Sequence, residues 1–323
     1  MQKIVKKSLI TGITGQDGMY LAKLLLEKGY EVIGVLLEGH QHSLERFKLF
    51  GLADRVQLRS CRLTEIDCVQ KLLSEVRPDE IYNLAAISSV GLSFEKPYQT
   101  MQYNVLSVVA LLEAVRRMGL NAKVYQASSS EMYGNATSLP VSEGSVLNPI
   151  SPYAVSKVSG HLLVQNYRLA YKMFCCSGIL FNHESVLRPV NFVTKKILAT
   201  AVRISRGSRE KLRLGNLSIK RDWGYAPQYV QAMWLMLQQP QAQDYVIASG
   251  EAHSLQEFVA CTFEELGLKW EDHVEIDKDL HRPSDIAVTY GDASRAKKEL
   301  GWEYKMSFKE LVSILVKEEL GTC

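Results

Sequence analysis

Three glycines near the N-terminus constrain the fold of this chain more than any other feature. The segment "SLITGITGQDGMYLAKLLL" at 8–26 begins with apolar and β-branched residues, passes through Gly12, Gly15 and Gly18, and continues with Leu and Ala at helical spacing. Glycine at such a turn permits backbone angles and close contacts that a side chain would prevent. The segment therefore predicts a strand, a tight turn and a helix, the first unit of an α/β fold.

The rest of the chain repeats this alternation of strands and helices. Apolar, strand-like runs occur at 8–11, 31–37, 56–58, 80–84, 123–128 and 175–181. Segments with helical spacing separate them, which predicts a Rossmann-type doubly wound parallel sheet with helices on both faces. After residue 181 the segments are mostly helical. We therefore expect a first domain at 1–181 and a smaller, mostly helical region at 182–323, with the run at 244–249 returning to the sheet.

Composition excludes several classes of protein. Of the 323 residues, 46% are apolar and 23% are charged, which is typical of a soluble globular protein with a large core. A net charge of +3 is too small to indicate nucleic-acid binding. No stretch of about 18 uncharged apolar residues occurs, and the first strand begins too early to leave room for a signal peptide. We expect a protein that binds neither nucleic acid nor membrane.

The cysteines favour a reducing compartment. There are six, and none of them forms a CxxC pair or a regular spacing. They are expected to be core thiols rather than a disulfide framework or metal ligands. We therefore expect a cytoplasmic protein without a metal site.

The glycine loop lies where a dinucleotide-binding fold holds its pyrophosphate. The first glycine makes the turn, the second lets the backbone approach the anion, and the third lets the helix pack close to the strand. The spacing GxxGxxG is the variant found in short-chain dehydrogenases. Glu38, at the end of the second strand, could bond both adenosine ribose hydroxyls and would repel a 2′-phosphate. It therefore favours NAD, with a solvated loop residue as the alternative interpretation.

A second motif supplies a possible proton acceptor. Tyr153 and Lys157 in "SPYAVSK" are one helical turn apart and share a face. A lysine cation beside a phenol is expected to lower the pKa of the phenol, so that Tyr153 can take a hydroxyl proton while a hydride leaves the same carbon. YxxxK alone is common by chance. Together with the glycine loop and the serine-rich "ASSSEMYG" at 127–134, it predicts dehydrogenase chemistry on a hydroxyl group.

Over nearly its whole length, the chain resembles one known family. The similarity rests on "TGITGQDG", "PDEIYNLAA", "YQASSSEMYG", "SPYAVSK", "GILFNHES", "FVTKKI", "LRLGN", "KRDWG", "RPSD" and "LGW". With these motifs it resembles the extended short-chain dehydrogenases/reductases and, among them, the GDP-mannose 4,6-dehydratases. The resemblance implies a lyase that converts a GDP-linked sugar into its 4-keto-6-deoxy form.

The resemblance also implies catalytic roles. Tyr153, aided by Lys157 and Ser129, would oxidise the sugar at C4. Glu131 would remove the C5 proton, which the new ketone acidifies. The C6 hydroxyl would leave as water with help from Glu131 or Ser130, and the hydride would return to C6.

Binding residues follow from the same resemblance, with 1–181 as the dinucleotide-binding domain and 182–323 as the main nucleotide-sugar-binding region. The implied cofactor-binding residues are Gly12, Thr14, Gly15, Gln16, Asp17, Gly18, Glu38, Arg62, Leu63, Leu84, Ala85, Ala86, Ser88, Tyr153, Lys157, His183 and Arg188. The implied substrate-binding residues are Ser88, Asn182, Lys196, Arg221, Arg282 and Asp285.

Four positions depart from the family pattern. Glu38–Gly39 replaces an Arg–Arg pair that reads the 2′-phosphate of NADP, and Arg62 replaces an Asp that meets adenine. Both changes favour NAD, although Arg62 could itself reach a phosphate, and NADP is the alternative that the family suggests. Ile87 and Ile150 replace a Gln and an Arg near the mouth of the site. The expected sugar is therefore a mannose-like hexose or heptose rather than mannose alone.

Two alternative functions remain open at this point. One is a nucleotide-sugar 4-dehydrogenase or reductase, an epimerase or a decarboxylase on the same scaffold. Glu131 argues against it, because a base at C5 is needed for dehydration. The other is a non-catalytic dinucleotide sensor, which would have no need of Ser129, Tyr153 and Lys157.

Two long helical segments predict the assembly. Those at 101–117 and 153–171 are apolar along one face. In this superfamily such helices pair across a two-fold axis, so a homodimer is expected, with a tetramer as the alternative.

Overall fold

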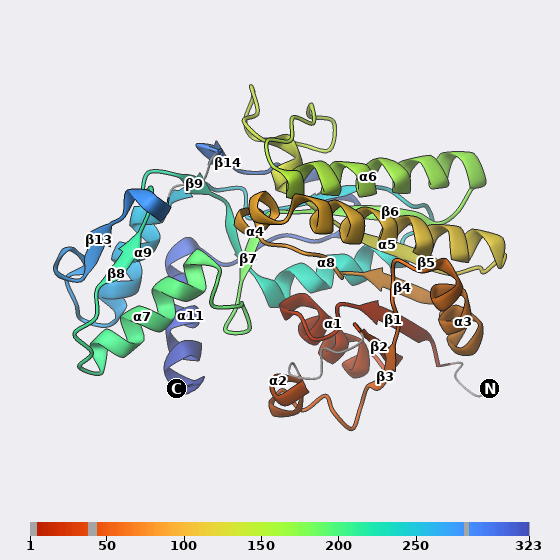
Figure 1. Ribbon diagram of the computed structural model, residues 1–323, viewed down its shortest axis with the longest axis horizontal. Coiled ribbons are helices and arrows are strands. Elements are labelled where there is room, and N and C mark those ends of the chain that lie inside the picture. Colours follow the sequence, from red (N-terminus) through yellow and green to blue (C-terminus); the bar gives the residue numbers. More distant parts are fainter. Residues whose placement is uncertain (1–4, 38–43, 281–283, 323) are drawn as a thin grey trace.

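The computed structural model describes residues 5–37, 44–280 and 284–322, which form a sheet domain and a smaller C-terminal lobe (Figure 1). Within these residues, one sheet has seven parallel strands in the order β3-β2-β1-β4-β5-β6-β11. The strands are β1 (Lys7–Thr11), β2 (Glu31–Leu36), β3 (Gln57–Ser60), β4 (Glu80–Asn83), β5 (Lys123–Ser129), β6 (Cys175–Leu180) and β11 (Tyr245–Ile247). The predicted doubly wound parallel sheet is confirmed.

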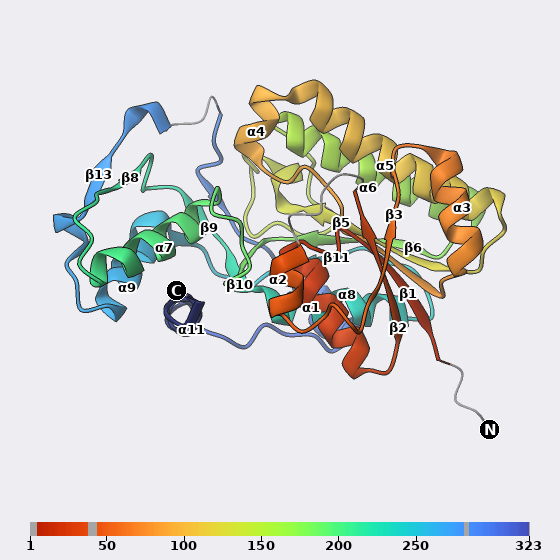
Figure 2. The ribbon, with the colours of Figure 1, turned by 60° about the horizontal axis from the view of Figure 1, so that its bottom comes forward.

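Helices cover both faces of this sheet (Figure 2). One face carries α1 (Gln16–Glu27), α2 (Leu44–Leu49) and α8 (Ala226–Gln238), and the other carries α3 (Ile66–Val76), α5 (Pro97–Arg117) and α6 (Pro152–Tyr171), with the short α4 (Val90–Glu95) beside them. Neighbouring strand residues point into opposite layers, because side chains alternate along a strand. Leu9 and Cys175 pack under α3, α5 and α6, whereas Ile10 and Cys176 pack under α1 and α8.

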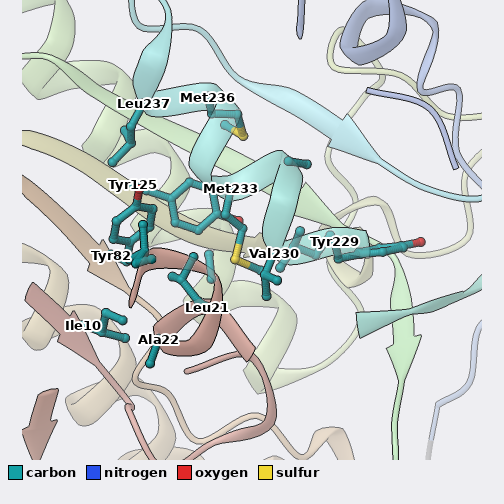
Figure 3. Packing of buried hydrophobic residues seen from close by; sticks show 14 of the residues in the cluster. Ile10, Leu21, Ala22, Tyr82, Tyr125, Tyr229, Val230, Met233, Met236 and Leu237 are labelled. Atoms are coloured by element: carbon teal, nitrogen blue, oxygen red, sulfur yellow. The ribbon is translucent and has the colours of Figure 1, made fainter. Parts of the chain in front are cut away.

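Helix α8 belongs to the sheet domain, although its place in the sequence suggests the C-terminal region. Val230, Met233 and Leu237 are buried against Ile10 and Leu21 (Figure 3). The chain then continues into β11, which pairs in parallel with β6. The segment 226–247 therefore completes the sheet domain after the chain has already entered the C-terminal lobe.

The C-terminal lobe has its own apolar core. Its elements are α7 (Val193–Ser205), β8 (Leu212–Leu214), α9 (Leu255–Glu265), the 3₁₀ turns Trp270–Asp272 and Lys278–Leu280, β13 (Val274–Ile276) and α11 (Phe308–Thr322). Trp223, Phe258 and Leu311 are buried at its centre. Short strands join the lobe to the sheet domain, namely β7 (Asn182–Glu184) with β10 (Trp223–Tyr225), and β9 (Lys220–Arg221) with β12 (His253–Ser254) and β14 (Val288–Thr289). Helix α10 (Ser294–Leu300) packs back against α8 and β11.

In the described part of the chain, no helix combines the length and apolar character needed to cross a membrane. The same residues contain no group of three or more His, Cys, Asp or Glu side chains placed to hold a metal ion. Cys61, Cys175 and Cys176 are buried, while Cys68 and Cys261 are partly exposed.

Candidate active site

The glycine loop between β1 and α1 leaves bare backbone at the start of a helix. Gly12 has a φ of +68°, and a Cβ there would lie 2.9 Å from the amide nitrogen of Ala85. A Cβ on Gly18 would lie 2.4 Å from the carbonyl oxygen of Gly12, so α1 can approach the turn only because this residue is glycine. Gly15 is exposed at the N-cap of α1. Backbone N–H groups at a helix N-terminus bind anions, so the loop fits the pyrophosphate of a dinucleotide.

A cleft of about 650 Å³ lies at the carboxyl ends of β1, β4, β5 and β6, between the sheet and the C-terminal lobe. Most of the predicted site residues line it: Gly12, Gly15, Gln16, Asp17, Gly18, Leu84, Ala85, Ala86, Ser88, Ser129, Ser130, Glu131, Tyr153, Lys157, Asn182, His183, Arg188 and Arg221. Residues from distant parts of the chain thus meet in one cleft. Its position matches the rule that ligands of open α/β sheets bind outside the carboxyl ends of the strands.

Other predicted residues lie outside this cleft. Lys196 and Asp285 line an adjoining pocket of about 240 Å³. Thr14 is partly exposed in the glycine loop and does not line the cleft. Arg62 is exposed and forms an ion pair with Glu65 at 2.8 Å, and Leu63 is buried in the layer under α3 and α5.

Glu38 and Arg282 lie outside the described residues. The roles assigned to them therefore rest on the sequence.

Tyr153 and Lys157 both lie on α6 and face the cleft. The Lys157 Nζ donates a hydrogen bond to the Ala127 carbonyl oxygen at 2.9 Å and lies 5.6 Å from the centre of the Tyr153 ring. Burial raises the pKa of Tyr153 to about 12, although the Ser129 hydroxyl acts in the opposite direction. Burial also favours the neutral form of Lys157 and lowers its pKa to about 8. The expected lowering of the Tyr153 pKa is therefore absent in this structure, because burial outweighs the hydrogen bond with Ser129.

The serine-rich segment ends β5 and turns into the cleft. Ser129 is the last residue of β5, and the 3₁₀ turn Ser130–Tyr133 follows it directly. The Glu131 amide donates a hydrogen bond to the Ser129 Oγ at 3.2 Å, and this bond caps the turn. Ser130 is buried, while Glu131 is partly exposed. The turn therefore brings a hydroxyl group and a carboxylate to the same wall of the cleft as Tyr153.

An ion pair joins the glycine loop to β7. The His183 Nε2 lies 2.9 Å from one carboxylate oxygen of Asp17 and 3.0 Å from the other, and its Nδ1 lies 2.7 Å from the Phe181 carbonyl oxygen. Because both ring nitrogens face acceptors, the imidazole is held as a cation. Burial lowers the pKa of His183, but the ion pair and hydrogen bond with Asp17 have the larger combined effect and raise it. Burial raises the pKa of Asp17, but His183 and Gln16 together lower it.

Further polar contacts surround the ion pair between Asp17 and His183. Gln16 donates a hydrogen bond to the His183 carbonyl oxygen at 3.0 Å and accepts one from the Ser185 hydroxyl at 2.8 Å. Arg188 pairs with the buried Glu184 at 3.2 Å. The start of α1 and the segment 182–188 are thereby held as one wall of the cleft.

Arg221 and Asp285 connect the cleft to the adjoining pocket. The buried Arg221 donates hydrogen bonds to Asp285 Oδ1 at 2.8 Å and to the Ile286 carbonyl oxygen at 2.6 Å. Lys196 donates to the Arg213 carbonyl oxygen at 2.6 Å beside the same pocket. Cationic side chains therefore border both cavities, an arrangement that suits a ligand with a diphosphate.

Sequence reasoning missed several residues that line the cleft. Tyr103 reaches it from α5, Asn191 and Phe192 come from the loop before α7, and Trp223 comes from β10. Phe192 and Trp223 belong to the motifs "FVTKKI" and "KRDWG", which could have identified them, whereas Tyr103 and Asn191 lie outside every recognised motif. Phe192 also contacts a predicted site residue, because the Arg188 guanidinium carbon lies 3.9 Å from the centre of its ring.

Comparisons with known proteins match nearly the whole chain. The model of the family described as GDP-mannose 4,6 dehydratase matches residues 9–315. GDP-mannose 4,6 dehydratase 1 of Arabidopsis thaliana is 46% identical over 325 residues, which cover 98% of this chain and 90% of the relative.

Solved structures show the same fold. A dTDP-glucose 4,6-dehydratase of Bacillus anthracis, solved with NAD, has a TM-score of 0.84 at 21% identity and covers 97% of this chain and 96% of its own. RMD of Pseudomonas aeruginosa, complexed with NADPH, has a TM-score of 0.82 at 20% identity. The match covers 99% of this chain and 100% of the RMD chain. At these identities the two structures establish the fold alone.

Proposed function

Because the chain belongs to the GDP-mannose 4,6-dehydratase family, we propose that it removes water from a GDP-linked, mannose-like hexose or heptose. The enzyme is a nucleotide-sugar 4,6-dehydratase, a hydro-lyase that uses a nicotinamide dinucleotide. Its product is a 4-keto-6-deoxy sugar. The observation that carries the proposal is that Glu131 lines the same cleft as Ser129, Tyr153 and Lys157.

The glycine loop, Asp17 and His183 would hold the dinucleotide. When bound there, a nicotinamide dinucleotide would supply the acceptor for the C4 hydride and the source of the hydride at C6. The positive end of α1 favours the pyrophosphate. Arg188, which lines the cleft near this loop, adds a second positive charge.

Tyr153 acts on the C4 hydroxyl. Its phenolic oxygen takes the hydroxyl proton as the C4–H bond breaks, and the Ser129 hydroxyl orients the sugar oxygen by hydrogen bonding. The Lys157 ammonium, held by the Ala127 carbonyl oxygen, stabilises the phenolate. Burial raises the pKa of Tyr153 to about 12, so the tyrosine is protonated at neutral pH before the substrate and dinucleotide bind.

Glu131 acts once the 4-ketone has formed. The ketone acidifies the neighbouring C5–H, and the Glu131 carboxylate removes that proton. The C6 hydroxyl leaves as water after it receives a proton from Glu131 or Ser130. An epimerase has no step that needs this base, so the position of Glu131 favours dehydration over epimerisation.

The nucleotide part of the substrate would extend toward the C-terminal lobe. Arg221 faces the cleft and Lys196 the adjoining pocket, where both can neutralise a diphosphate. Ile87 lines the cleft at the position where the family pattern has a glutamine. An apolar side chain there favours a sugar that presents a less polar edge.

We further propose that NAD is the preferred dinucleotide. At the end of the second predicted strand, Glu38 replaces an arginine of the family pattern, and no Arg or Lys follows it before Arg46. A carboxylate near the 2′-phosphate of NADP would weaken binding about ten- to a hundredfold. Titrating the protein with both dinucleotides tests this. Tighter binding of NADP that Glu38→Gln leaves unchanged would contradict it.

Incubation with a panel of nucleotide sugars tests the activity itself. A GDP-linked hexose or heptose should give a product lighter by one water, detected by mass spectrometry. Tyr153→Phe should abolish both oxidation and dehydration, because no phenol remains to take the C4 hydroxyl proton. Normal turnover by this variant would overturn the mechanism. We place this reaction in the cytosol, in keeping with the cysteine composition.

A further inference from the structure

We propose that Cys61 and Cys68 form a reversible disulfide, a modification site behind the loop that joins β3 to α3. Their sulfur atoms lie 2.8 Å apart. A disulfide bond is about 2.05 Å long, so the sulfurs need to move by less than about 1 Å to form it.

The backbone holds both cysteines in this arrangement. Cys61 follows β3 directly, and its amide donates a hydrogen bond to the Leu36 carbonyl oxygen at 3.2 Å. Cys68 lies in the first turn of α3, where the Val69 amide bonds to the Glu65 carbonyl oxygen at 3.1 Å. Both thiols join the apolar layer under α3 and α5. The short contact therefore results from the packing of a strand end against a helix start.

The two thiols differ in access, which suggests the order of the reaction. Cys68 is partly exposed, whereas Cys61 has no exposed surface. A small disulfide such as glutathione disulfide can reach Cys68 first. The Cys68 thiolate attacks one sulfur of the oxidant, breaks its S–S bond and releases one glutathione thiolate.

The Cys61 thiolate then attacks the Cys68 sulfur and releases the second glutathione. The protein loses two protons and two electrons in total, and glutathione disulfide is reduced by the same amount. The bond closes the loop that carries Arg62 and Leu63, two residues that the family resemblance implies bind the cofactor.

The other described cysteines offer a contrast. Cys175 and Cys176 are neighbours on β6 and point into opposite layers of the sheet domain, so they cannot meet without distorting the strand. Cys261 lies on α9 in the C-terminal lobe. The proposal is therefore specific to one pair of thiols.

The test counts thiols and does not depend on catalysis. The full chain with Cys261→Ser and Cys323→Ser is incubated with glutathione disulfide, alkylated, digested and mapped by mass spectrometry. We expect neither Cys61 nor Cys68 to be alkylated, and the peptides that contain them to be joined with a mass lower by two hydrogen atoms. Dithiothreitol should restore both thiols to full alkylation. Cys175 and Cys176 should stay reduced and serve as internal controls.

Single variants test the order of the reaction. Cys61→Ser should leave Cys68 carrying one glutathione, and Cys68→Ser should leave Cys61 unmodified. Alkylation of both cysteines after exposure to the oxidant would overturn the proposal. So would a stable glutathione adduct on Cys68 in the protein that retains Cys61. Because both of these outcomes are read in the protein with the intact pair, a variant that misfolds does not affect the test.

Discussion

At the scale of single residues, one carboxylate separates two reactions that share a cleft. In the proposed mechanism, Tyr153, Ser129 and Lys157 serve the oxidation at C4, a step that an epimerase or dehydrogenase also requires. Glu131 adds a base two residues beyond Ser129, held by the hydrogen bond from its own amide to the Ser129 hydroxyl. We therefore expect the outcome of the reaction to depend on whether Glu131 can accept the C5 proton once the 4-ketone has formed.

Replacing Glu131 by Gln should uncouple oxidation from dehydration. The amide keeps the shape of the side chain but cannot accept the C5 proton, so formation of the 4-keto-6-deoxy product should fall by roughly a hundredfold or more. Single-turnover absorbance of the reduced dinucleotide should still show C4 oxidation. Glu75→Gln, on the exposed face of α3, is the matched control and should leave both steps unchanged. Dehydration by Glu131→Gln at the normal rate would remove this residue from the mechanism.

At the scale of elements, the junction of β1 and α1 depends on a glycine that no other residue can replace without strain. A methyl group on Gly18 would press against the backbone of Gly12 and Ile13, at 2.4 Å and 2.7 Å. Backbone atoms on both sides leave little room for relaxation. The helix can therefore keep its position only with hydrogen in place of a side chain.

Gly18→Ala should lower the free energy of unfolding by roughly 1–3 kcal/mol, the usual cost of overpacking. It should also weaken dinucleotide binding, because the loop must shift. Urea denaturation and titration with the dinucleotide measure the two effects. Gly144→Ala is the control, since no heavy atom lies within 4 Å of a Cβ at that position. Equal stability of the two variants would contradict the proposed close contact.

The ion pair between α1 and β7 should make stability depend on pH. The raised pKa of His183 means that its contribution is complete below its ordinary value of 6.5 and is lost as the pH rises through the raised pKa. The lowered pKa of Asp17 means that its contribution is complete above 3.8 and is lost as the pH falls through the lowered pKa. The pair therefore stabilises the fold most between these two limits.

Urea denaturation across a pH series measures this dependence. In the wild-type protein, the free energy of unfolding should decline above pH 6.5 as His183 loses its proton. His183→Gln should be less stable at neutral pH, because the partly buried Asp17 would lose its cationic partner, and the alkaline decline should become smaller. An unchanged alkaline slope in the variant would show that another group causes it.

At the scale of the whole molecule, α5 and α6 leave an apolar surface in contact with solvent. The two helices pack against each other on one side of the sheet domain, as Figure 1 shows. Leu106 is 44% exposed on α5, and Leu162 and Leu169 are 50% and 70% exposed on α6. Large apolar side chains gathered on neighbouring helices are typical of an interface between subunits.

We expect a homodimer in which these helices pair across a two-fold axis. Light scattering at micromolar concentration should give the mass of two chains. Leu162→Glu combined with Leu169→Glu should give a monomer, because each charge would be buried without a partner. Leu49→Glu, at a residue of α2 that is 88% exposed, should leave the dimer intact. A monomeric wild-type protein would rule out this interface.

Much of the sheet domain can be predicted from sequence because its determinants are local. The apolar runs at 31–37, 80–84 and 175–181 correspond to β2, β4 and β6, and the run at 244–249 contains β11. Helix α8 could not be assigned in this way. Its apolar face is compatible with either lobe, and only its contacts with α1 and the sheet place it in the sheet domain.

The sequence by itself determined those features that depend on backbone sterics and short spacing. Gly12, with its positive φ, and Gly18, with no room for a Cβ, can be recognised because only glycine satisfies such geometry. Tyr153 and Lys157 can be paired because one helical turn separates them. These requirements are met within a few residues of the chain.

Only the tertiary structure decided what surrounds these groups. Asp17 and His183 are 166 residues apart, and no spacing rule predicts that they meet. The pKa of Tyr153 is raised rather than lowered because α6 buries the phenol in the completed fold. Cys61 and Cys68 approach each other because α3 packs onto the end of β3. Burial and long-range contacts arise from the packing of whole elements, so they are absent from any short stretch of sequence.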